Sequence, residues 1–110
     1  MTGRVTVSNP KGTQWETRLV RYLVDKGFPY VERRARSGRN DKGDLSGLPG
    51  IVIEAKNVKA LNLAGWIDEL VVEKRNAGVE QGAVIFPRKS HTTGRAYVLL
   101  ELDDYLELIR

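Results

Sequence analysis

The sequence has no cysteine and only one histidine, His91, among its 110 residues. Without cysteine the chain cannot form a disulfide or a thiolate zinc site, and one imidazole cannot supply the paired histidines that most catalytic zinc centres use. Any metal ion must therefore be held mainly by oxygen. His91 stands alone in a polar segment, which favours a solvent-exposed residue over a general base.

The sequence also lacks long apolar runs. No stretch approaches the roughly 20 apolar residues of a membrane helix, and the first residues lack the apolar region of a signal peptide. We therefore expect a cytoplasmic protein without membrane contact. The apolar fraction of 41% and the charged fraction of 29% are ordinary for a globular protein, and the length suits one domain over residues 1–110.

Positive charge is concentrated in the first part of the chain. The net charge is +4, but residues 1–42 carry ten Lys/Arg against four acids, whereas residues 43–110 carry eight against ten. A local basic excess is typical of a surface that meets a polyanion, although it also serves solubility. Nucleic acid is the partner that this pattern favours.

Helical periodicity alternates with short strand-forming runs. The apolar spacing predicts helices at 13–26, 62–77 and 102–109, and strands at 30–35, 51–56, 82–86 and 96–100, with a short extended segment that begins at 44. Gly47-Leu48-Pro49-Gly50 predicts a hairpin turn. The order αβββαββα implies an α/β fold, with a mixed central β-sheet flanked by helices on both faces. Trp15 and Trp66 fall on apolar helical faces, which favours core packing over base stacking.

Three polar residues around this hairpin could do chemistry. Glu54 and Lys56 follow the most hydrophobic strand and share one face of it, and Asp44 opens the opposite arm of the hairpin. Two converging carboxylates can hold a hard divalent cation, with the backbone carbonyl of Ala55 as a further ligand, while an ammonium can orient water or stabilise a developing negative charge. Alternatively, Asp44 only starts a strand, and Glu54 and Lys56 form a solvated pair without a chemical role.

Gly43-Asp44, a spacer of nine residues and Glu54-Ala55-Lys56 resemble the signature of the PD-(D/E)XK nuclease superfamily. The order of elements resembles its αβββαβ, restriction-endonuclease-like core. Three further segments resemble archaeal-type Holliday junction resolvases and related phage enzymes: Lys11-Gly12-x-x-x-Glu16, Gly27-Phe28 and Arg36-Ser37-Gly38. The sequence departs from the pattern at Gly43, where the motif has proline, and at Thr17, where an arginine often follows the helix glutamate.

The resemblance implies roles for these residues. Asp44 and Glu54 would be metal ligands, Lys56 the catalytic lysine, Glu16 a further acid that reaches the site from the first helix, and Ser37 a loop residue near the scissile phosphate. Mg²⁺ would be the cofactor, for which Mn²⁺ could substitute. A homodimer would pair two sites, and a phage-encoded chain would act in the host cytoplasm.

The role of Glu16 has a second interpretation, because Thr13-Gln14-Trp15-Glu16 has the form of a capping box in which Glu16 only caps the helix. The role of the basic residues also has two interpretations, since they could bind phosphates or form a solvated basic edge of the sheet. The predicted DNA-binding residues are Arg33, Arg34, Arg36, Ser37, Arg39, Lys42, Arg88 and Lys89.

The sequence thus predicts a Mg²⁺-dependent endonuclease, expected to resolve Holliday junctions in DNA recombination by cutting phosphodiester bonds at branched DNA. Two alternatives stay open. One is a nicking or restriction-type nuclease of the same superfamily that acts on duplex or flap DNA. The other is a nucleic-acid-binding module that does not cut, although such a module has no reason to place an acidic pair near phosphate.

Overall fold

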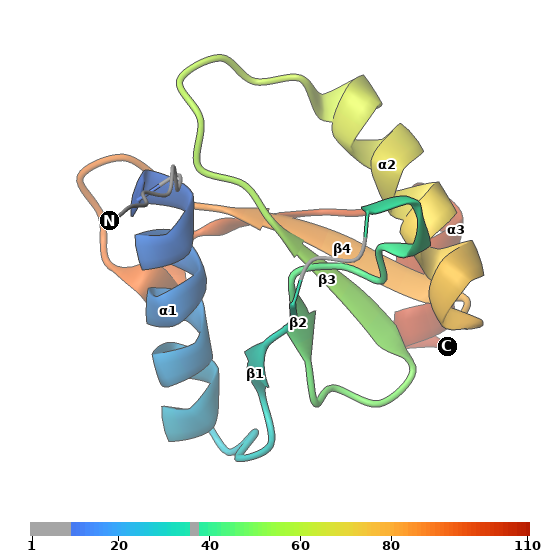
Figure 1. Cartoon of the computed structure of the whole chain (residues 1–110), viewed down its shortest axis with the longest axis horizontal. Helices are drawn as coiled ribbons and strands as arrows, with labels where there is room; N and C mark the ends of the chain where they lie inside the picture. The colour runs from blue at the N-terminus through green and yellow to red at the C-terminus, as the bar shows by residue number, and fades with distance from the viewer. Residues whose placement is uncertain (1–9, 36–37) are drawn as a thin grey trace, which may run out of the picture.

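The computed structural model describes residues 10–35 and 38–110. Along this part of the chain, three α-helices and five strands follow one another in the predicted order αβββαββα (Figure 1). The helices are α1 (Pro10–Asp25), α2 (Leu63–Ala77) and α3 (Leu102–Ile109). The strands are β1 (Glu32–Arg33), β2 (Leu45–Ser46), β3 (Ile51–Ala55), β4 (Gln81–Phe86) and β5 (Tyr97–Leu99), and short 3₁₀ turns lie at Gly38–Asn40 and Thr93–Arg95.

The strands form one mixed sheet in the order β1-β2-β3-β4-β5. β3 and β4 are parallel, and the other neighbouring pairs are antiparallel. The turn over residues 47–50 joins β2 to β3 with Leu45 opposite Ile53, which confirms the expected hairpin. The parallel pair requires the crossover through α2, so the predicted mixed α/β sheet is confirmed.

The two faces of the sheet are covered by different helices, as Figure 1 shows for α1 and α2. On one face, Trp15 and Leu19 of α1 pack with Ile53 of β3, and Trp15 Nε1 donates a hydrogen bond to the Ile85 carbonyl at 3.1 Å. On the other, Trp66 and Leu70 of α2 pack against the sheet. Both tryptophans are buried, as predicted.

Side chains alternate across the sheet along β3, which fixes where Glu54 lies. Ile53 belongs to the core cluster under α1, and Val52 belongs to the cluster under α2. With a period of two residues, Glu54 shares the α2 face with Val52. A carboxylate is therefore placed where the helix would otherwise meet an apolar residue.

Helix α2 has well-defined ends. The Asn62 side chain accepts a hydrogen bond from the amide of Gly65 at 3.1 Å, and Gly78 ends the helix with a φ of 70° in the left-handed conformation. Lys74 Nζ donates a hydrogen bond to Asp104 at 2.6 Å, which connects α2 to α3. No helix in the described part of the chain is both long and apolar enough to cross a membrane.

Two elements differ from the sequence prediction by more than one residue at an end. The first helix begins at Pro10 rather than at 13, so Thr13 lies inside it and the predicted capping box is wrong. Proline suits the first turn of a helix, where its missing N–H has no intrahelical acceptor to lose. Strand β1 is limited to Glu32–Arg33 instead of 30–35, because only these residues pair with β2.

Candidate metal centre

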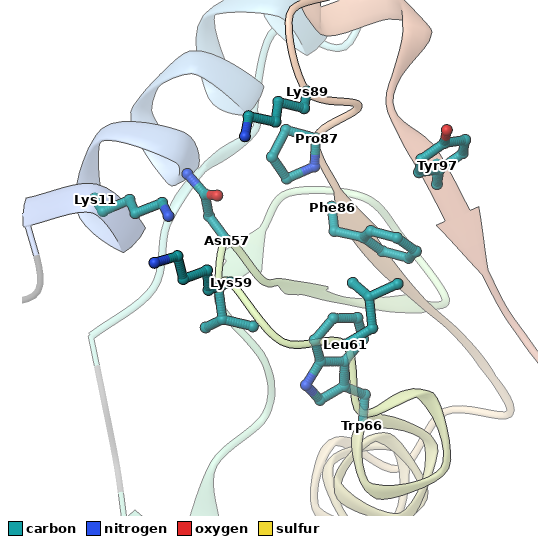
Figure 2. A pocket seen from close by; sticks show the side chains of 10 residues that line it. Lys11, Asn57, Lys59, Leu61, Trp66, Phe86, Pro87, Lys89 and Tyr97 are labelled. Atoms are coloured by element: carbon teal, nitrogen blue, oxygen red, sulfur yellow. The ribbon is translucent and has the colours of Figure 1, made fainter.

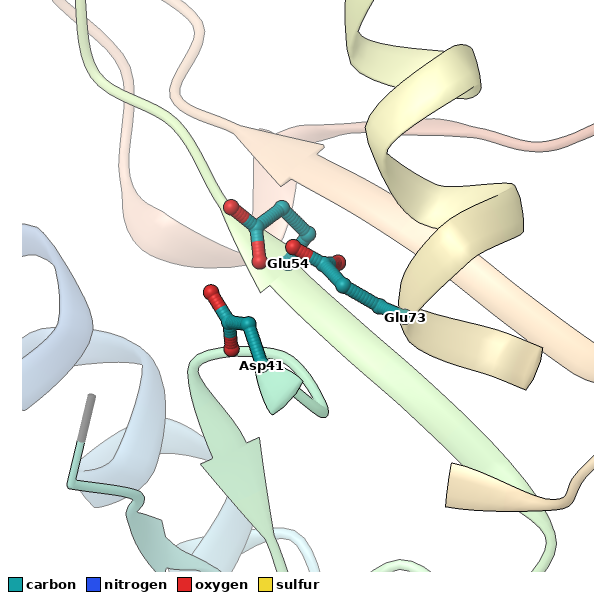
Figure 3. Close-up of side chains that lie close together, drawn as sticks. All are labelled: Asp41, Glu54 and Glu73. Carbon is teal, nitrogen blue, oxygen red and sulfur yellow. The ribbon is translucent and has the colours of Figure 1, made fainter. Parts of the chain in front are cut away.

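Three carboxylates from separate parts of the chain converge beside β3 (Figure 3). Asp41 follows the first 3₁₀ turn, Glu54 lies on β3 and Glu73 lies on α2, and one oxygen from each lies within 4.8 Å of the others. Glu54 and Glu73 are only 6% and 5% exposed. Such a cluster of oxygen ligands could hold a metal ion.

The electrostatics of the cluster are unfavourable without a cation. Burial raises the pKa of Glu54 to about 10, helped by the charges of Asp44 and Glu73 and by a hydrogen bond with Glu73, while Lys56 opposes the rise. Burial also raises the pKa of Glu73 to about 7, opposed by the hydrogen bond with Glu54 and helped by the charges of Asp41 and Asp44. The folded chain therefore holds protons here that a bound cation would replace.

The unpaired oxygens of the cluster fit a metal ion. Oε1 of Glu54 and Oε1 of Glu73 are buried, and neither has a hydrogen-bond partner within the part of the chain that the structure describes. A buried acceptor without a partner is costly in a native protein, and a bound cation would give both oxygens one. Carboxylate oxygens are the donors that hard divalent cations prefer.

Asp44 lies beside this cluster and is fixed by the backbone. Its Oδ2 accepts a hydrogen bond from the amide of Ala55 at 2.8 Å, and its own amide donates to the carbonyl of Ile53 at 2.8 Å. Asp44 and Glu54 are thus neighbours across the hairpin, as expected. Asp44 is not one of the three clustered acids, so its role as a ligand stays a prediction, as does that of the Ala55 carbonyl.

Gly43 is required by the close approach of this segment to β3. Its φ is 100°, and a Cβ there would lie 2.7 Å from Cγ1 of Val52 and 2.9 Å from the carbonyl oxygen of Ile53. Proline, which the motif has at this position, is locked near a φ of −65°. The departure at Gly43 therefore has a local backbone explanation.

Lys56 points at the acidic cluster, on the side that the strand period predicted. Its Nζ lies 2.8 Å from Glu69 and 3.6 Å from Glu54. Burial lowers the pKa of Lys56, but the hydrogen bond with Glu69 and the charges of Glu54 and Glu69 outweigh it, so the pKa is raised. Lys56 is therefore an ammonium at neutral pH, which suits charge stabilisation rather than proton abstraction.

Asn76 holds the segment that carries Asp41 against α2. Its Nδ2 donates to the carbonyls of Arg39 and Asp41, both at 2.9 Å. The Asp41 side chain in turn accepts a hydrogen bond from the amide of Gly43 at 2.9 Å. Since Asn76 lies one turn after Glu73, the same helix supplies one carboxylate and positions another.

Glu16 is buried on α1 and pairs with Arg33, whose Nε donates to Oε1 of Glu16 at 3.0 Å. The capping role predicted for Glu16 fails because the helix begins earlier. Glu16 is not part of the three-carboxylate cluster. The side chain of Arg33 is still 47% exposed, so its guanidinium retains a surface for a phosphate.

The other predicted DNA-binding residues lie in different settings. Arg34 is partly buried, and its Nε has no hydrogen-bond partner among the described residues. Arg39, Lys42 and Lys89 are exposed, and Arg88 is partly buried. Arg36 and Ser37 lie outside the described residues. His91 is exposed, as predicted.

The sequence prediction missed Asp41 and Glu73. Glu73 could have been found, because it recurs with Trp66 and Leu70 on the buried face of α2, where a glutamate breaks the apolar stripe. Asp41 gave no such signal, since it occurs in a polar, glycine-rich loop.

Comparisons of the chain with protein-family models, with curated proteins and with solved structures found no significant match.

Proposed function

We propose that this protein is a Mg²⁺-dependent DNA endonuclease that cuts at branched DNA, as the resemblance to Holliday junction resolvases implies. One observation carries the proposal. Buried carboxylates that repel one another lie beside an ammonium at the end of β3. A structural protein gains nothing from such a cluster, whereas phosphodiester hydrolysis needs a hard cation and a nearby positive charge.

Asp41, Glu54 and Glu73 would hold the cation, and Asp44 is close enough to raise the pKa of Glu54. Mg²⁺, or Mn²⁺ in its place, supplies Lewis-acid stabilisation of the phosphate oxygens when bound. The ammonium of Lys56 stabilises the negative charge that develops on the phosphate during attack. Glu69 holds that ammonium in position through the 2.8 Å contact.

Cationic side chains near the cluster supply the binding of the DNA backbone. Arg34 precedes the site, and its backbone amide donates to the carbonyl of Asp44 at 2.8 Å. Arg34 is only partly buried, and a guanidinium pairs well with phosphate oxygens. Arg39 and Lys42 flank Asp41 on exposed positions, where they contact phosphates without reading the sequence.

A second copy of the chain would pair two sites for symmetric cutting of two strands. The surface that supports this part of the proposal is formed by exposed apolar side chains of β5 and α3. Val98, Leu102 and Ile109 are all at least 60% exposed. Sedimentation of the full chain tests this part, and a monomer at all concentrations contradicts it.

Cleavage assays test the activity. The purified chain is incubated with a labelled four-way junction, a duplex or a single strand, in Mg²⁺ or in EDTA. We expect Mg²⁺-dependent cutting of the junction, loss of cutting in Glu54→Gln, and retained cutting in Glu80→Gln, an exposed glutamate outside the cluster. No Mg²⁺-dependent cutting of any substrate would refute the enzyme.

The same assay separates the alternatives. Equal cutting of duplex and junction refutes junction specificity and favours a nicking or restriction-type nuclease. Tight DNA binding without cutting favours a binding module. Glu16→Gln distinguishes a chemical role of this acid from its ion pair with Arg33, because a large loss of kcat at unchanged DNA affinity requires the former.

A further inference from the structure

A pocket of about 540 Å³ lies beyond the carboxyl ends of the parallel strands β3 and β4. It has two chemically different ends (Figure 2). The nitrogen atoms of Lys11, Lys59 and Lys89 gather around Asn57, whereas Trp66 and Phe86 form an apolar end. Pockets of this size at the carboxyl ends of parallel strands are common ligand sites.

The apolar end is built from aromatic rings in contact. The ring of Phe86 lies 5.2 Å from that of Trp66 and 5.3 Å from that of Tyr97, measured between centroids. Trp66 is buried, but Tyr97 is 48% exposed and Leu61 is 62% exposed. This end therefore combines a rigid aromatic floor with apolar walls that remain open to a ligand with a flat ring.

The polar end of the pocket carries three lysines whose charges are not paired with acidic side chains of the described residues. Within residues 10–35 and 38–110, no acidic side chain forms an ion pair with Lys11, Lys59 or Lys89. The three lysines come from α1 and from the segments that follow β3 and β4. An apolar slot for a ring beside a group of unpaired ammoniums matches the base and the phosphates of a nucleotide.

The pocket adjoins the proposed active site through the chain itself. Asn57 directly follows Lys56 in the sequence, and Lys59 lies three residues after Lys56. We propose that the pocket binds an unstacked base of the strand being cut, with its flanking phosphates on the three lysines. This inference rests on the proposed nuclease function and adds to it a substrate class, namely DNA with an unpaired nucleotide next to the cleavage point.

A balance of energies explains why an unpaired nucleotide is selected. Extrusion of a base from a duplex costs about as much as stacking on one aromatic site returns. A continuous duplex therefore gains nothing from the pocket, whereas a strand with a base that is already unpaired gains the whole interaction. A branch point that carries an unpaired base meets this requirement, so the pocket favours such branched DNA over continuous duplex.

Binding in EDTA tests the inference without cleavage. Fluorescence anisotropy compares three labelled duplexes, which carry one unpaired nucleotide, an abasic residue at the same position, or no insertion. We expect the unpaired base to bind about 5- to 100-fold more tightly than the abasic probe. Tyr97→Ala should remove most of this ratio, and Tyr97→Phe should keep it because the ring remains.

Matched variants separate the pocket from the general surface. Tyr30→Ala removes an exposed tyrosine between α1 and β1, outside the pocket, and should leave the ratio unchanged. Lys59→Ala should weaken the binding of both the unpaired-base probe and the abasic probe. Lys26→Ala, at an exposed lysine that does not line the pocket, should weaken it less. Equal binding of the base and abasic probes by the unsubstituted chain would overturn the inference, as would equal weakening of both by Tyr97→Ala.

Two further outcomes separate this inference from neighbouring ideas. A base preference without Mg²⁺-dependent cutting supports the pocket and refutes the nuclease, whereas cutting without a base preference refutes only the pocket. Displacement of the DNA is also measured with free deoxyadenosine monophosphate. If this nucleotide binds more tightly than the unpaired-base probe, the pocket serves a small nucleotide and the proposed DNA strand is wrong.

Discussion

Substitution of Glu73 by glutamine should stabilise the metal-free protein at alkaline pH. The pKa of Glu73 is raised from 4.5 to about 7 in the folded chain, so the folded state prefers the protonated acid. The contribution of Glu73 to stability is therefore greatest below about pH 4.5 and is lost as the pH rises towards 7, because the unfolded chain releases this proton more readily. Glutamine has no charge to lose and removes the penalty.

The structure sets the size of this effect. The rise from 4.5 to about 7 corresponds to roughly 3 kcal/mol. We expect Glu73→Gln to recover about 1–3 kcal/mol at pH 8, because the glutamine amide must also find hydrogen-bond partners in a buried site. At about 4 °C per kcal/mol for a domain of this size, Tm should rise by roughly 4–12 °C. At pH 5 the gain should fall below about 1 kcal/mol.

Thermal unfolding by circular dichroism in EDTA at pH 5 and pH 8 measures this difference. Glu80→Gln is the control, since Glu80 is exposed and lies outside the cluster. An equal gain at both pH values would mean that packing, not charge, is responsible. No gain at pH 8 would refute the argument that burial and the neighbouring acids raise the pKa of Glu73.

Mg²⁺ or Mn²⁺ should stabilise the unsubstituted chain more than Glu73→Gln, which is the reverse of the order expected without metal. The unsubstituted chain should gain about 2.7 kcal/mol at a metal concentration one hundred times Kd, whereas Glu73→Gln offers a neutral amide oxygen in place of a carboxylate and should gain much less. A Tm that responds equally to metal in both proteins would mean that the charge of Glu73 does not contribute to metal binding.

Three further predictions concern the residues around the cluster. Lys56→Ala should lower kcat roughly 100- to 1,000-fold while DNA affinity in EDTA changes little; a parallel loss of affinity would make Lys56 a binding residue instead. Gly43→Ala should cost roughly 2–4 kcal/mol in urea unfolding, because strain and a steric clash add, whereas Gly50→Ala, with open space around it, should cost about 1 kcal/mol. Asn76→Ala should weaken Mn²⁺ binding in calorimetry about tenfold by releasing the Asp41 segment, and an unchanged Kd would contradict that positioning role.

Much of the architecture follows from local patterns in the sequence. The turn over 47–50, the strand that carries Glu54 and the Gly78 stop of α2 are set by residues with strong local preferences, and the structure has them close to where they were predicted. The start of α1 was misplaced because Thr13-x-x-Glu16 matches a capping box, while Pro10 allows an earlier start. Local patterns cannot choose between two acceptable starts.

The site was only partly predictable for a related reason. Asp44, Glu54 and Lys56 meet through a hairpin and a strand period, which can be deduced from spacing. Asp41 reaches Glu54 only because Asn76 fastens its loop to α2, and Glu73 reaches it only because α2 crosses β3. These contacts depend on tertiary packing, which no short window of sequence encodes. The partner of Glu16 was missed likewise, since Arg33 lies on a different element.

The separation of the three carboxylates along the chain also has a kinetic consequence. Residues 41, 54 and 73 belong to a loop, a strand and a helix, and no two of them are near neighbours until the β3–α2–β4 crossover has formed. An unfolded chain therefore offers a cation single, weakly binding acids. A divalent cation should act mainly by slowing unfolding and should leave the folding rate almost unchanged. The lifetime of the native chain would then depend on how much Mg²⁺ surrounds it.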